Sequence, residues 1–101
     1  MSHFGLSSDN INKINLIFNQ YPEINEVLIF GSRAKGNYRA NSDIDLAIKG
    51  TDISLSTLQQ IEIKLDELFI PNFIDLVVYE KIENPELISH INRIGKHFYK
   101  K

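Results

Sequence analysis

Three aspartates and a glycine-serine pair are the residues of this chain whose types and spacing could do chemistry. Gly31-Ser32 closes an apolar run, and Asp43 and Asp45 follow after ten intervening residues, separated from each other by one isoleucine. Hard cations such as Mg²⁺ prefer oxygen ligands and often take only one or two carboxylates, leaving other positions to waters and substrate phosphates. The pattern therefore predicts a phosphate-cradling turn beside a metal site.

The surroundings of Gly31 support the phosphate half of this hypothesis. Residues 25–30 are apolar and branched, which predicts a strand, and residues 32–35 could begin a short helix that Gly36 ends. The strand would deliver a helix N-terminus to its own tip, where unpaired backbone N–H groups bind phosphate. Gly31 lets phosphate oxygens approach without a Cβ in the way, and the Ser32 hydroxyl adds a donor.

The carboxylates are expected on two strands. Alternation along residues 43–48 puts Asp43 and Asp45 on one face of a strand and the larger apolar side chains on the other. Asp75 is a single charge within the apolar run 73–79, and carboxylates are seldom buried there unless paired or metal-bound. We expect Asp75 to complete the set, provided that the strand register turns it toward the pair.

Taken singly, each feature has an ordinary interpretation. Asp43 could cap a turn, Asp45 could be an exposed strand residue, and Gly31-Ser32 could be a simple turn. Their joint occurrence with Asp75 requires three coincidences and favours the metal-nucleotide site. Three basic residues of the connecting loop could neutralise a triphosphate or could equally be solvated: Arg33, Lys35 and Arg39.

These residues resemble the nucleotidyltransferase superfamily that includes DNA polymerase beta, and specifically its minimal stand-alone domains, over about residues 8 to 98. The resemblance implies an Mg²⁺-dependent enzyme with ATP as substrate, in which three aspartates are catalytic and ligate the metal: Asp43, Asp45 and Asp75. Gly31 and Ser32 would hold the β- and γ-phosphates, with Arg33 and Lys35 beside them.

The resemblance also implies a biological role. Minimal nucleotidyltransferases of this size typically act as antitoxins beside a helical HEPN toxin and transfer AMP to one of its tyrosines. Two alternatives stay open at this point: a binding subunit that neutralises a partner by contact alone, and a small-molecule nucleotidyltransferase. The short chain counts against the last, because it has no second domain to hold a small acceptor.

The composition and net charge limit the kinds of partner that we expect for this chain. The chain has 101 residues, 43% hydrophobic content and a net charge of -2, which fits one domain and argues against a long polyanion lying on its surface. Nucleic acid is therefore not the expected partner, whereas oligomerisation is left open. There is no cysteine, no run of membrane-spanning length and nothing typical of a signal peptide, so we expect a cytoplasmic protein.

Periodicity predicts helices over about residues 8–21, 54–69 and from 84–85 to 98, in the order αβαβαβα. In the last helix, His90 is expected to be a surface or hydrogen-bonded residue rather than a ligand, and residues 93–99 are expected to form a solvated end. Gly31-Ser32 lies at the C-terminal end of strand 25–30, whereas the acids lie near the N-terminal ends of their strands. The turn and the acids can therefore share one site only if strand 25–30 is antiparallel to strand 43–48. Strand 73–79 must then run parallel to 43–48, giving an α/β (α+β) fold with a small mixed sheet of about three core strands flanked by helices.

Overall fold

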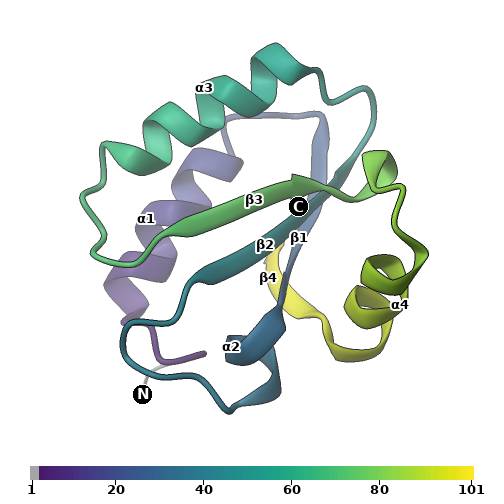
Figure 1. Ribbon diagram of the computed structural model, residues 1–101. Coiled ribbons are helices and arrows are strands. Elements are labelled where there is room, and N and C mark those ends of the chain that lie inside the picture. The colour runs from purple at the N-terminus through teal and green to yellow at the C-terminus, as the bar shows by residue number, and fades with distance from the viewer. Residues whose placement is uncertain (1–2) are drawn as a thin grey trace.

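A mixed sheet forms the centre of the computed structural model, which describes residues 3–101 (Figure 1). The strand order is β3-β2-β1-β4. β1 pairs antiparallel with β2 and β4, and β2 pairs parallel with β3. These directions confirm the arrangement that a shared site required. The strands are β1 (Ile24–Phe30), β2 (Ile44–Gly50), β3 (Ile74–Val78) and β4 (Lys96–Lys100).

The longer helices begin at side-chain caps. Ser7, Ser54 and Asn84 each accept a hydrogen bond from a backbone N–H of the first turn, which satisfies a donor that the helix itself leaves unpaired. No helix within residues 3–101 has the length and apolarity needed to cross a membrane. The helices are α1 (Ser8–Phe18), α2 (Gly31–Lys35), α3 (Leu55–Asp66) and α4 (Pro85–Ile94), with a 3-10 turn η1 (Tyr79–Lys81).

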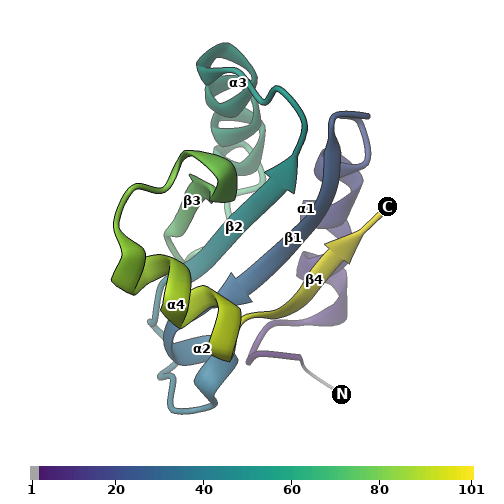
Figure 2. The same ribbon diagram turned by 90° about the vertical axis from the view of Figure 1, so that its right-hand side faces the viewer.

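The two faces of the sheet are covered differently. α1 and α3 cover one face, α4 lies on the opposite face, and α2 follows the end of β1 next to α4 (Figure 2). Ile44, Leu46 and Ile48 pack into the larger core with α1 and α3, whereas Ala47 joins a smaller cluster with Ile91 of α4. The predicted alternation of β2 is therefore confirmed, and its odd-numbered residues face the α4 side.

The C-terminal segment corrects the sequence prediction. The last helix ends at Ile94 rather than extending to residue 98, and β4 pairs with β1 through Val27 opposite Tyr99. Phe98 and Tyr99 are buried, so this end is not a solvated tail. Gly95 leaves the helical conformation with ψ of 141°, and the free edge of β1 then gains a partner for its backbone groups.

Candidate functional site

Asp45 and Asp75 lie side by side on neighbouring parallel strands. They are direct partners in the ladder between β2 and β3, so their side chains leave the sheet on the same face. This is the α4 face, because Ala47 and Val77, two residues further along each strand, both belong to the cluster with α4. Asp43 directly precedes β2. The register thus brings together Asp45 and Asp75, two of the three carboxylates that the sequence predicted as one set.

The half-buried carboxyl of Asp45 lies near two other carboxylates that repel its negative charge. Its partial burial, followed by the negative charges of Asp75 and Asp43, raises the pKa of Asp45 above its ordinary value, while the positive charge of Arg33, and that of His90 when its imidazole is protonated, act in the opposite direction. Like charges held this close favour a bound cation, which would relieve the repulsion. The donor set consists of oxygens only, which suits a hard divalent metal such as Mg²⁺.

The carboxylates form an open arrangement rather than a closed cage. Within residues 3–101, no group of three Asp, Glu or His side chains converges closely enough to surround a metal by itself. Asp43 and Asp75 are exposed and Asp45 is partly buried. Such a set would leave ligand positions to water and to substrate phosphates, as Mg²⁺ sites in phosphate-handling proteins usually do.

The Gly31 turn is built directly against Asp45. Phe30, the last residue of β1, pairs with Asp45 in the antiparallel ladder, and Gly31 follows with φ of 72°, in the left-handed region. A Cβ on Gly31 would collide with Oδ2 of Asp45. Gly31 and Ser32 therefore begin α2 beside the carboxylate pair, as the sequence predicted for the turn and the acids.

Arg33 occupies a different place from the one predicted. Its side chain is only 2% exposed, and its guanidinium donates to the carbonyl oxygens of Phe4, at 2.7 Å, and Ser42, at 2.9 and 3.2 Å. It also donates to Ala40 and lies over the Tyr38 ring at 5.2 Å. We therefore assign Arg33 a structural role, because these bonds tie down the loop that leads into Asp43 and leave it poorly placed to bind phosphate.

The two other basic residues of this region are on the surface. Lys35, the last residue of α2, and Arg39, in the following loop, are both exposed. Among the described residues neither of them forms an ion pair. Both side chains are therefore available to a triphosphate, and their participation stays a prediction.

His90 is a site residue that sequence reasoning missed. It projects from α4 to the turn, where its Nε2 accepts a hydrogen bond from the Gly31 N–H at 3.2 Å. A lone histidine on an amphipathic helix gives no local signal of such a contact, because 59 residues separate the two partners. Only the packing of α4 next to α2 reveals it.

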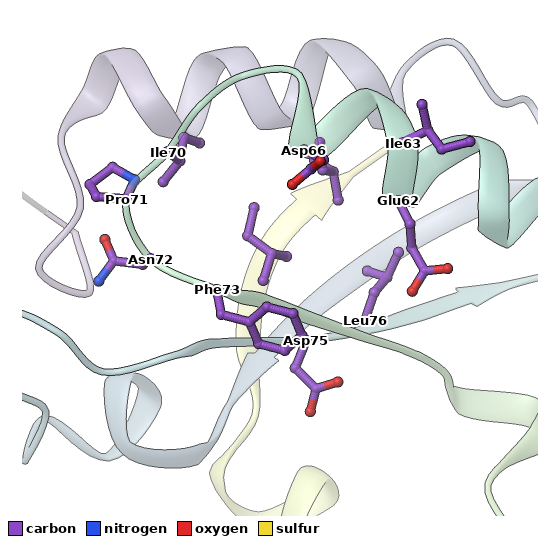
Figure 3. A pocket seen from close by; sticks show the side chains of 11 residues that line it. Glu62, Ile63, Asp66, Ile70, Pro71, Asn72, Phe73, Asp75 and Leu76 are labelled. Carbon is purple, nitrogen blue, oxygen red and sulfur yellow. The ribbon is translucent and has the colours of Figure 1, made fainter.

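A cavity also lies next to β3, apart from the carboxylate site. This cavity, of about 520 Å³, lies between the C-terminal half of α3 and β3, with Ile63, Ile70 and Phe73 in its lining. Asp75 contributes to its edge, but Figure 3 shows the Asp75 carboxylate pointing away from α3. The carboxylate site is therefore on the opposite face of β3 from this cavity.

Known structures share this fold. A chain of a toxin-antitoxin crystal structure with AMP-PNP is 24% identical, with a TM-score of 0.73 over 95% of this chain and 75% of that one. A chain of a complex of tri-AMPylated Shewanella oneidensis HEPN toxin with MNT antitoxin is 21% identical, with a TM-score of 0.70 over 95% and 74%. A chain of the MntA-HepT toxin-antitoxin structure is 23% identical, with a TM-score of 0.70 over 94% and 74%.

Sequence comparison gives the family independently of these structures. No curated protein matches the chain. The family described as Polymerase beta, Nucleotidyltransferase matches residues 12–101, which include the turn and all three aspartates. The chain therefore belongs to the polymerase beta nucleotidyltransferase family.

Proposed function

We propose that this nucleotidyltransferase transfers AMP from ATP to a tyrosine hydroxyl of a HEPN-type toxin, and thereby acts as its antitoxin in the cytoplasm. The observation that carries the proposal is the in-register pair Asp45 and Asp75 beside the Gly31 turn, in a chain of this family. A similar fold occurs in a complex with a HEPN toxin, and the toxin in that complex is tri-AMPylated, which supports the choice of partner. A similar fold crystallised with AMP-PNP supports an adenine nucleotide.

The oxygen-only donor set supports Mg²⁺ as the metal, and the repulsion from Asp75 and Asp43 that helps to raise the pKa of Asp45 favours a bound cation. Asp43 and Asp45 would hold it, with Asp75 as a further ligand. When bound, Mg²⁺ neutralises charge on the phosphates and lowers the pKa of the attacking hydroxyl. The repulsion among the carboxylates implies that metal and nucleotide bind together more favourably than the nucleotide alone.

The chain's own groups would position the reaction. The acceptor oxygen attacks the α-phosphorus and forms a new O–P bond, while the bond to the leaving pyrophosphate breaks on the opposite side. Asp75, exposed at the edge of the pair, would take the proton of the acceptor hydroxyl. Ser32 and Lys35 would hold the outgoing phosphates, because Ser32 lies in the first turn and Lys35 at the end of the short helix next to Asp45.

The proposal is tested by labelling. We expect radioactivity from α-³²P-ATP, but not from γ-³²P-ATP, to appear on a co-purified HEPN toxin in the presence of Mg²⁺, and chelation of the metal to stop it. Phosphoamino acid analysis should place the AMP on tyrosine. Label from the γ position would instead identify phosphoryl transfer, and label on a small molecule alone would exclude a protein acceptor.

Replacing Gly31 tests whether the turn and the carboxylates form one site. Gly31→Ala adds a Cβ where the Asp45 carboxylate lies, at a residue with positive φ, so we expect Asp45 to be displaced. A displacement of about 1 Å can lower a rate about 100-fold. Left-handed backbone should also cost about 1–2 kcal/mol of unfolding free energy. Labelling rates and urea denaturation measure the two effects.

Gly36→Ala is a matched control. Gly36 also has positive φ, at 87°, but a Cβ there meets no atom within 4 Å. It should show a similar loss of unfolding free energy and keep the transfer rate within about threefold of wild type, since no group of the site is displaced. Equal loss of transfer in both variants would mean that backbone strain, and not contact with Asp45, explains the effect.

A further inference from the structure

Two residues distant in the sequence lie against the Gly31 turn. One is Asp45 of β2, whose carboxylate is so close that any side chain on Gly31 would collide with it. The other is His90 of α4, whose Nε2 accepts the Gly31 N–H at 3.2 Å. A nitrogen that accepts this bond carries no proton, so the neutral imidazole has its proton on Nδ1.

The imidazole of His90 is itself fixed in place. Its ring meets the Phe30 ring edge-on, with 6.0 Å between centroids and 80° between planes. The next residue, Ile91, is 1% exposed and anchors α4 in the cluster with Leu28 and Phe30. A hydrogen-bond acceptor held by packing on a rigid element fixes its partner more closely than a mobile side chain would.

The contact also changes the expected contacts of the nucleotide. The Gly31 N–H was predicted to bind phosphate, but in this structure it is already paired with His90. A phosphate would therefore be left with the Ser32 end of the turn, next to Asp45. The role of Gly31 becomes conformational, because glycine allows the backbone to turn here. The hydrogen bond to His90 then holds the turn in place next to Asp45.

We propose that His90 is a positioning residue for nucleotide binding, which acts by accepting the Gly31 N–H and so fixing the phosphate-binding turn against Asp45. The chemistry required of residue 90 is an acceptor at the place of Nε2, not a charge and not a proton donor. This inference rests on the proposed site, and it concerns a side chain that would not itself touch the reacting atoms.

Two substitutions separate the acceptor from the packing. His90→Leu keeps an apolar contact with Phe30 and removes the acceptor, whereas His90→Gln retains an amide oxygen that can reach the place of Nε2. Calorimetric titration of the full chain with ATP and Mg²⁺ gives the Kd. We expect His90→Leu to weaken binding about five- to tenfold, the effect of one lost hydrogen bond, and His90→Gln to restore it to within about twofold of wild type.

Kinetics with a HEPN toxin as acceptor supply a second readout. The KM for ATP should rise in His90→Leu while kcat stays within about twofold, since the lost contact acts on binding. Wild-type Kd in His90→Leu, or a Kd in His90→Gln as weak as in His90→Leu, would overturn the inference. Should His90→Leu fail to fold by circular dichroism, His90→Met replaces it and the same outcomes apply.

Asp45→Asn in the same series separates this inference from the proposed function. If Asp45→Asn abolishes transfer and His90→Leu binds ATP as wild type does, the site stands and only the role of His90 is wrong. If Asp45→Asn transfers AMP at the wild-type rate, the proposed carboxylate site itself is wrong.

Discussion

Replacing both β2 carboxylates, in Asp43→Asn/Asp45→Asn, should reduce AMP transfer by about 1,000-fold or more. The two changes remove two negative charges from the site and keep the shape of the side chains, so the metal is held much more weakly while the sheet is preserved. Metal-assisted charge stabilisation is usually the dominant part of catalysis in phosphoryl and nucleotidyl transfer. The labelling rate with α-³²P-ATP measures the loss, and circular dichroism verifies the fold.

Asp52→Asn is the matched control. Asp52 lies beyond the end of β2, is exposed and has φ of 55°, a conformation that asparagine tolerates well. It makes the same chemical change away from the site and should leave the rate within about twofold. Full transfer by the double variant would refute the carboxylate site. Neutralisation of the toxin by a double variant that transfers no AMP would instead show a contact-only antitoxin.

The second large effect is expected on stability, at Arg33. Arg33→Met keeps much of the side chain's volume but leaves the carbonyls of Phe4, Ala40 and Ser42 without their buried donor. Each unsatisfied buried group costs about 1–3 kcal/mol, and some of these oxygens keep another partner. We therefore expect a loss of about 2–4 kcal/mol in unfolding free energy, measured by urea denaturation.

Arg39→Met controls for the loss of a positive charge in this region, because Arg39 lies in the loop that follows α2. Arg39 is exposed, so its replacement should change the unfolding free energy by less than about 0.5 kcal/mol. The pair also decides between two roles for Arg33. If Arg33→Met kept wild-type stability and weakened only ATP binding, the original prediction of a phosphate contact would be right and the structural assignment wrong.

Much of the site follows from short patterns whose physics is local. Alternation along β2 puts the carboxylates opposite the apolar residues, and the positions of Gly31 and the acids at the ends of their strands require the observed strand directions. Asn84 and Pro85 mark the start of α4 because a side-chain acceptor and a fixed φ are both favoured there.

The parts that sequence reasoning missed depend on distant partners. Phe98 fits the helical spacing of the residues before it, but Gly95 ends the helix. Residues 96–100 then form a strand because their backbone groups pair with the otherwise unpaired edge of β1. An arginine in a polar segment, such as Arg33, is usually solvated. Its burial here depends on backbone carbonyls that only the folded loop brings together. His90 needs the packing of α4 to meet Gly31.

The register between β2 and β3 sets the distance between the Asp45 and Asp75 carboxylates. Adjacent strands lie about 4.8 Å apart, so in-register partners are near neighbours, and a slip of two residues would move Asp75 about 6.6 Å along the strand. The start of β3 is fixed by the Ile44 N–H, which donates to Phe73 at 2.8 Å, and by Asn72, whose amide donates to Ala40 and Ser42. The chain can therefore vary in length before Pro71 without disturbing the site, whereas the interval from Asn72 to Asp75 has to keep its length for the two acids to face each other.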